Sequence, residues 1–342
     1  MDPVEAVRSR LAERRVPGAG PLVHEEVLGV ADQLAAAQLL VGAVAEHGGT
    51  AVSSVEFLAV SVGVVLGCRL DDGRGVVLKA FRPSVARRAI EAGQHAQRLA
   101  IEAGLAAPRP LVPPFGLGTG LATLESLLLD GERGDVRPPP VRLQLAGGLQ
   151  HLVAVLAPMR SDPGLDRPDR ALRTADGSPY AAPHSSLFDF DATADGAAWI
   201  DDAAWAALDV LGGALSDRSA VVHSDWRAEN VRMGPCGVAA VYDWDSLQAG
   251  DEAALVGGVA RAFSTDWTQS DPMIPTVADM LGFVDDYQSC RPAPFSPDEK
   301  RRVHAGIVHA LAYSARCEHS LGDRVTWAWG FRSLLTEFLH VG

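Results

Sequence analysis

Asparagine and lysine are the scarcest residues in this chain of 342 residues. It contains one asparagine, Asn230, and two lysines, although Lys and Arg together number 30. Because the chain uses these side chains almost nowhere else, Asn230 and Lys79 are candidates for positions where that particular side chain is required. The formal charge of −13 argues against a nucleic-acid or acidic-membrane partner and favours a cationic ligand.

Cysteine and long apolar runs are also scarce. The four cysteines form no C-x-x-C pair, which argues against both a disulfide framework and a zinc site, so we expect them to be reduced and buried. No apolar run reaches the roughly 20 residues needed to cross a bilayer. The first residues lack the basic and apolar regions of a signal peptide. These absences predict a cytoplasmic globular protein with no membrane partner.

The apolar pattern predicts a small β-rich part followed by a larger, mainly helical part. Residues 55–81 carry a three-stranded antiparallel meander, and residues 121–129 have the length and apolarity of a further strand. Glycine and a triple proline follow, which predicts a boundary between an N-terminal lobe, 1–129, and a helical C-terminal lobe, 130–342. Helices are expected over residues 4–11, 27–44, 86–103, 141–156 and 197–215, and through most of the chain after residue 251.

Several polar residues stand at spacings that suit phosphoryl transfer. His223, Asp225 and Asn230 follow the pattern H-x-D-x-x-x-x-N, and Asp243 follows a turn 18 residues after Asp225. Phosphoryl transfer requires charge neutralisation on the phosphates, oxygen ligands for metal ions and a carboxylate near the attacking hydroxyl. A helix cap at Asp225 and a turn aspartate at Asp243 are common structural uses of such residues. These two structural uses do not explain why His223, Asp225, Asn230 and Asp243 occur together at this spacing.

The segment around these residues resembles the aminoglycoside phosphotransferase and choline kinase-like family, which is related to the protein kinases. The resemblance rests on His223-Ser224-Asp225 with Asn230, on the run 241–245 (V-Y-D-W-D), which is expected to be a short strand, and on Gly250-Asp251. Ser224 stands where the family usually has glycine, and Glu252 where it has proline. The resemblance implies an α+β, bilobal protein-kinase-like fold with a small antiparallel-sheet N-lobe and a larger, mainly helical C-lobe.

The same resemblance implies roles for residues of the C-lobe. Asp225 would be the catalytic base or the carboxylate that orients the hydroxyl. Asn230 and Asp243 would hold Mg²⁺, a hard cation that prefers oxygen ligands. Arg227 would face the transferred phosphate and neutralise charge that develops there, although it could instead pair with Glu229 or solvent.

For the N-lobe, the resemblance implies that ATP or GTP binds to the sheet. Lys79 would contact the phosphates and pair with a helix glutamate, for which Glu91 is the choice. The turn with Ser61 and Gly63 would cradle the phosphates with backbone N–H groups. Backbone groups of residues 124–128 would contact the adenine.

Together these features predict an ATP- or GTP-dependent kinase that phosphorylates a hydroxyl of a small molecule. An aminoglycoside or another amino sugar or amino alcohol suits the acidic balance of the chain. The alternatives are a protein serine/threonine kinase, because residues 225–230 look like D-L-K-P-E-N, and a nucleotide-binding scaffold without turnover. Trp-Asp follows Asp243 where a protein kinase has Phe-Gly. Acceptor contacts are expected within residues 161–201 and the final helices, whereas the acceptor's identity and the oligomeric state cannot be read from the sequence.

Overall fold

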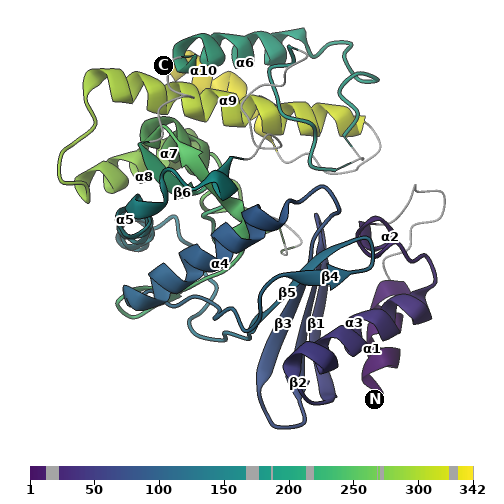
Figure 1. Ribbon diagram of the computed structural model, residues 1–342. Helices are drawn as coiled ribbons and strands as arrows, with labels where there is room; N and C mark the ends of the chain where they lie inside the picture. The colour runs from purple at the N-terminus through teal and green to yellow at the C-terminus, as the bar shows by residue number, and fades with distance from the viewer. Residues whose placement is uncertain are drawn as a thin grey trace. The chain divides into compact units, whose positions relative to one another are not determined.

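The chain forms two compact units. The computed structural model describes residues 1–12, 23–166, 177–185, 188–212, 219–267, 269, 273–322 and 330–341 (Figure 1). The first unit comprises Met1–Ile101 and Ala107–Leu129, and the second comprises Glu102–Ala106 and Asp130–Gly342. The segment Glu102–Ala106 therefore belongs with the second unit, and the main division of the chain lies between Leu129 and Asp130.

The first unit is built on a five-stranded antiparallel sheet in the order β1-β2-β3-β5-β4. The predicted meander is confirmed, since β1 pairs with β2 and β2 with β3. The expected strand at residues 121–129 ends at Ser126, and the short strand β4 was not predicted. The strands are β1 (Val52–Val60), β2 (Val64–Leu70), β3 (Gly75–Ala80), β4 (Phe115–Leu117) and β5 (Gly120–Ser126).

One face of this sheet is apolar and carries the core of the unit. Residues of a strand alternate between its faces, so Leu66, Leu78 and Leu124 point the same way, and all three are fully buried. They cluster with Leu40 and Val44 of helix α3 (Gln33–Gly48), which lies across the sheet (Figure 1). The N-terminal helices are α1 (Pro3–Ala12), α2 (Val23–Leu28) and α3 (Gln33–Gly48). The expected single run over 27–44 is divided between α2 and α3, because Gly29 adopts a left-handed conformation (φ 67°) and Asp32 caps α3.

The second unit is mainly helical, as predicted. Two short antiparallel pairs interrupt the helices, and in them β6 pairs with β9 and β7 with β8. The longest helix, α9, packs against α6, α7 and α10 (Figure 1). The helices are α5 (Pro139–Val155), α6 (Ala198–Leu211), α7 (Glu252–Ala260), α8 (Val277–Ser289), α9 (Pro297–Leu321) and α10 (Phe331–Val341). The strands are β6 (Ala220–His223), β7 (Val231–Gly234), β8 (Gly237–Val241) and β9 (Leu247–Gly250).

Two glycines allow α7 and α9 to cross with their backbones in contact. A Cβ added to Gly257 would lie 2.2 Å from the carbonyl oxygen of Val303, and one added to Gly306 would lie 2.2 Å from that of Ala254. A backbone oxygen cannot rotate away as a flexible side chain can. Any side chain at either position therefore forces the two helices apart.

We expect Gly257→Ala to lower the free energy of unfolding by about 1–3 kcal/mol, the usual cost of overpacking a core. The adjacent Gly258 provides a matched control, because nothing lies within 4 Å of the position of its Cβ. Gly258→Ala should raise stability by roughly 0.5–1 kcal/mol through helix propensity. Urea denaturation followed by circular dichroism measures both variants, and equal shifts in the two would contradict the close crossing.

The cysteines follow the expectation only in part. Cys68 and Cys317 are buried, and burial raises the pKa of each thiol to about 12. Cys236 is exposed in the turn between β7 and β8, so the prediction that all four are buried was wrong. In the part of the chain that the structure describes, no helix combines the length and the apolarity needed to span a membrane.

Candidate active site

The loop after β6 holds Asp225 by both carboxylate oxygens. Asn230 Nδ2 donates to Asp225 Oδ2 at 2.8 Å and to the Asp225 backbone oxygen at 3.0 Å. Arg227 Nη1 lies 2.7 Å from Oδ1 of the same carboxylate. Three of the residues selected from the sequence therefore form one contact group. The side chain of Asp225 remains about one quarter exposed (23%), so it is both fixed and accessible.

Arg227 also reaches a second carboxylate. Its Nη2 lies 3.1 Å from Glu229 Oε2, so the guanidinium links Asp225 to Glu229. Burial raises the pKa of Glu229, and the positive charge of Arg227 opposes that rise. Arg261 lies in the same environment, where burial lowers its pKa and the charge of Asp225 opposes the change. The surroundings of Asp225 thus combine two guanidinium groups with carboxylates.

The β7–β8 hairpin brings Asp243 to the end of the loop that carries Asn230. Val231 pairs with Val241 at the open end of the hairpin, and the Tyr242 N–H donates to the Asn230 backbone oxygen at 2.8 Å. Residues 230 and 243 therefore flank the same end of the hairpin, although they are 13 positions apart in the sequence. Backbone pairing is the cause of this proximity.

Asp243 adopts a strained backbone conformation. Its φ of 62° and ψ of 48° lie in the left-handed region, and it is the one residue other than glycine with positive φ among the described residues. The expectation of a strand through residues 241–245 was wrong, because β8 ends at Val241 and a 3₁₀ turn, Trp244–Ser246, follows Asp243. Asp243 precedes this turn without capping it through its side chain; instead Ser246 Oγ donates to Asp243 Oδ2 at 3.0 Å. Such strain persists where the surroundings impose it, and it is concentrated at functional sites.

His223 connects the two loops from the interior. It is fully buried, and its Nε2 donates to the carbonyl oxygen of Tyr242 at 2.8 Å. Burial lowers the pKa of His223, which favours the neutral ring. Ser224 adds a parallel link, since its Oγ donates to the Ser246 backbone oxygen at 2.7 Å. His223 therefore fixes the backbone next to Asp243 and lies away from solvent.

The donor atoms of Asn230 and Asp243 fit a hard cation. Nδ2 of Asn230 is turned toward Asp225, which leaves the amide oxygen as the atom that could bind a metal ion. Asp243 supplies a carboxylate at the same end of the hairpin. Among the described residues no group of three or more His, Cys, Asp or Glu side chains could hold a metal. Mg²⁺ bound with nucleotide phosphates and water needs only one or two carboxylates, so the residues present suit it.

In the first unit, Lys79 and the predicted phosphate turn lie at the same end of the sheet. Lys79 pairs with Val65 and Ala80 pairs with Val64, which directly follows the turn of residues 61–63. A Cβ on Gly63 would lie 2.7 Å from the carbonyl oxygen of Ala80, so the turn approaches β3 as closely as glycine allows. Ser61 is exposed, and its N–H donates to the Gly63 backbone oxygen at 3.1 Å.

Glu91, the predicted helix partner of Lys79, lies on the exposed side of α4 (Arg87–Glu102). The buried side of that helix carries two amides, Gln94 and Gln97. Gln94 Nε2 donates to the Val112 backbone oxygen at 2.9 Å, which anchors the helix to the loop before β4. The structure does not bring Glu91 to the buried side of α4.

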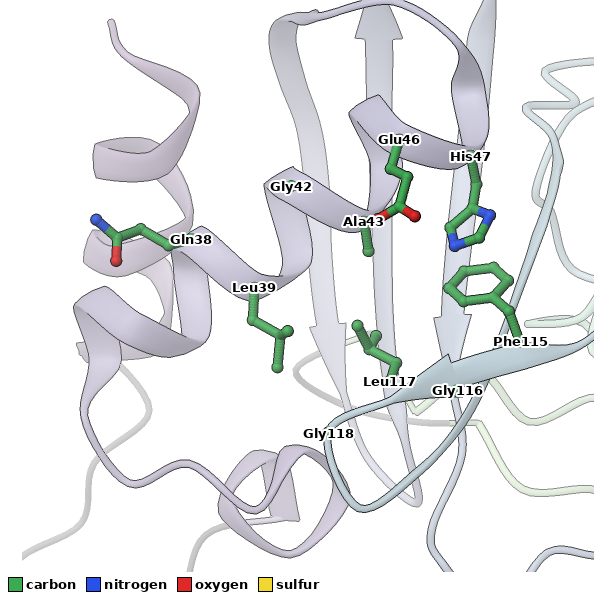
Figure 2. Close-up of a pocket in the computed structure, with 10 residues that line it drawn as sticks. All are labelled: Gln38, Leu39, Gly42, Ala43, Glu46, His47, Phe115, Gly116, Leu117 and Gly118. Carbon is green, nitrogen blue, oxygen red and sulfur yellow. The ribbon is translucent and has the colours of Figure 1, made fainter.

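A separate pocket of about 310 Å³ opens between α3 and the β4–β5 turn (Figure 2). His47 stacks on Phe115 at one end, with ring centroids 3.6 Å apart. The pocket shares no lining residue with the predicted nucleotide or catalytic residues. Its lining is formed by Gln38, Leu39, Gly42, Ala43, Glu46, His47, Phe115, Gly116, Leu117 and Gly118.

Comparison with known proteins identifies the family. The model of the APH phosphotransferase enzyme family matches residues 68–293, about two thirds of the chain. The chain belongs to this family. It is thus a phosphotransferase of the small-molecule kinase type, and the predicted resemblance and the kinase-like fold class are confirmed. None of the curated proteins matches the chain.

Solved structures of APH-type kinases share the fold at low sequence identity. Spectinomycin phosphotransferase APH(9)-Ia, in complex with ADP and spectinomycin, has a TM-score of 0.55 at 12% identity, covering 89% of this chain and 93% of that one. Amicoumacin kinase hAmiN, in complex with AMP-PNP, Ca²⁺ and Ami, has a TM-score of 0.54 at 12% identity, covering 83% and 86%. A mutant of aminoglycoside phosphotransferase APH(4)-Ia, with AMP-PNP and hygromycin B, has a TM-score of 0.52 at 15% identity, covering 87% and 98%.

Sequence reasoning missed one polar contact of this phosphotransferase's loops, that of Ser246. Its hydroxyl fixes Asp243, and its backbone oxygen accepts from Ser224. A serine three residues after an aspartate carries no distinctive signal, so spacing alone could not reveal it. Part of the segment expected to contact the acceptor, residues 167–176 and 186–187, lies outside the described residues.

Proposed function

We propose that this protein transfers the terminal phosphoryl group of ATP, or GTP, to a hydroxyl of a small molecule. The observation that carries the proposal is the double restraint of Asp225 by Asn230 and Arg227. A carboxylate held in one orientation and still accessible suits a group that orients an attacking hydroxyl and accepts its proton.

Each of the other residues has a role in the proposal that follows from its chemistry. Asn230 and Asp243 hold Mg²⁺ through oxygen atoms, and the ion supplies charge neutralisation on the phosphates. Arg227 lies next to Asp225 and offsets negative charge that develops on the transferred group. Lys79 contacts the phosphates, and the backbone of the turn with Ser61 and Gly63 cradles them. The AMP-PNP and ADP named in the similar structures support an adenine nucleotide.

For the acceptor we propose an amino sugar, an aminoglycoside or another amino alcohol. The formal charge of −13 favours a cationic acceptor in general. The similar structures contain spectinomycin, hygromycin B and amicoumacin, which supports an antibiotic-like alcohol without selecting one.

A mass-spectrometric screen tests this proposal. The protein, Mg²⁺ and either ATP or GTP are incubated with panels of aminoglycosides, macrolides, sugars and amino alcohols. We expect a mass gain of one phosphoryl group on at least one compound, with ADP or GDP formed in equal amount. Binding of nucleotide without transfer to any compound would favour a scaffold, and phosphate on an added protein substrate would favour a protein kinase.

A further inference from the structure

Glu125 is an acidic residue of β5 that shares a sheet face with Lys79. In the antiparallel pair of β3 and β5, Val77 lies opposite Glu125 and Lys79 lies opposite Thr123. Because the faces of a strand alternate, all four side chains project from the same face. Glu125 is thus the diagonal neighbour of Lys79. Diagonal neighbours lie about 7–8 Å apart, within reach of long side chains.

The opposite face of these strands is the apolar core, which leaves the Lys79 face as the polar one. Val76, Leu78 and Leu124 are fully buried in the core cluster, whereas Lys79 and Glu125 are only partly buried. A partly buried carboxylate requires a positive charge or hydrogen-bond donors to offset its lost hydration. Lys79 is the cationic side chain that the strand register places on this face of β3.

Helix α4 contributes an amide to this carboxylate. Gln97 is buried, and its Nε2 donates to Glu125 Oε2 at 2.8 Å. The carboxylates of α4 itself, Glu91 and Glu102, are both exposed. The buried side of the helix therefore has a neutral donor where the family resemblance implies a glutamate, and the nearby acid belongs to the sheet.

From this arrangement we infer that Glu125, held by Gln97, is the carboxylate that pairs with Lys79 and aims its ammonium at the nucleotide phosphates. This inference rests on the proposed function. Gln97 is a neutral hydrogen-bond donor, so it fixes the orientation of the Glu125 carboxylate without neutralising its negative charge. That charge can then attract the Lys79 ammonium. Both members of the pair belong to adjacent strands of one sheet, so a movement of α4 would not separate them. Glu125 is a positioning residue, since it acts through Lys79.

The first test is the affinity for AMP-PNP and Mg²⁺, measured by calorimetry with Glu125→Gln. We expect binding to weaken about ten- to a hundredfold, the effect of losing one charge-assisted hydrogen bond. Glu125→Asp, which keeps the charge on a shorter side chain, should recover part of the loss. Glu102→Gln, at an exposed position of α4, is the control and should leave the affinity unchanged.

The second test exchanges the two functional groups. In the double variant Glu125→Gln with Gln97→Glu, the carboxylate moves to α4 while the amide moves to β5. We expect nucleotide affinity to return to within a few-fold of the wild-type value. A purely structural role of Glu125 predicts instead that Glu125→Gln alone keeps the affinity, because glutamine preserves the shape and its amide oxygen can still accept from Gln97. Thermal melting of every variant shows whether the fold is kept.

The outcomes separate this inference from the proposed function. Normal nucleotide affinity in folded Glu125→Gln, or a large loss in Glu91→Gln instead, would overturn the pairing while the kinase assignment stood. If Glu125→Gln did not fold, failure of folded Glu125→Asp to differ from Glu125→Ala in affinity would overturn it. A wild-type protein that binds neither AMP-PNP nor the corresponding guanine analogue GMP-PNP would overturn the proposed function itself and the pairing with it.

Discussion

Asp225→Asn is expected to slow phosphoryl transfer by about 10²–10⁴-fold, the usual contribution of a positioned acid–base group. The substitution keeps the size and planarity of the side chain, and an amide oxygen can still accept from Asn230 Nδ2, which lies 2.8 Å from Asp225 Oδ2 in the wild type. It removes the negative charge that Arg227 contacts and the oxygen that would accept the hydroxyl proton. Nucleotide affinity should change little, because the proposed nucleotide contacts lie elsewhere.

Single-turnover transfer to an acceptor found in the screen measures the loss, and calorimetry with AMP-PNP measures binding. Asp209→Asn is the matched control, since Asp209 is exposed on α6 and belongs to neither of the loops that carry the proposed catalytic and metal-binding residues. Transfer by Asp225→Asn at the wild-type rate would remove Asp225 from its proposed role. A parallel loss of nucleotide affinity would indicate instead that the substitution disturbs the loop through Arg227 and Glu229.

The parts of this protein that the sequence predicted correctly depend on local pattern. In the β1–β2–β3 meander, apolar residues either alternate with polar ones or form short continuous runs, and turn residues separate the strands. These strands could therefore be predicted directly from residues 52–80. The H-x-D-x-x-x-x-N spacing is also a local pattern, because one short loop brings Asp225 and Asn230 into hydrogen-bond contact. Both features require only short-range geometry.

The parts that were missed depend on contacts between distant segments. Strand β9, four residues long, exists because it pairs with β6, about 27 positions earlier in the chain. Its sequence, Leu247–Gly250, is too short for a periodic signal. The rotation of α4 likewise depends on distant contacts, because packing of Gln94 and Gln97 against residues 112–125 sets it and leaves Glu91 exposed.

Asp243 combines both situations. The sequence made the residue a candidate metal ligand, yet the run 241–245 predicted a strand where the chain makes a left-handed turn. The conformation is imposed from outside, by the His223 hydrogen bond to Tyr242 and by the contacts of Ser246. A conformation that a free chain disfavours, maintained by buried partners, indicates that the position of this carboxylate matters.

We therefore expect Asp243→Asn to abolish most of the Mg²⁺ dependence of nucleotide binding and to lower transfer about 10²-fold or more, because the metal would lose its proposed charged ligand. Asparagine tolerates the left-handed region, so this variant separates the loss of charge from backbone strain. Asp243→Gly should lose the Mg²⁺ dependence in the same way as Asp243→Asn. Its backbone should also be free of strain, since glycine accepts a φ of 62°. Asp243→Ala would add strain and is expected to melt at a lower temperature than either.

The decisive measurement is AMP-PNP affinity as a function of Mg²⁺ concentration, which requires no acceptor. In the wild type and in the exposed-surface control Asp285→Asn, affinity should rise steeply with Mg²⁺. In Asp243→Asn and Asp243→Gly the curve should be flat or displaced to much higher Mg²⁺. If both variants kept the wild-type curve, Asp243 would not be a metal ligand. Its strained backbone would then serve only to direct the chain from β8 into the turn at Trp244–Ser246, a role that melting of the glycine variant would detect as a gain in stability.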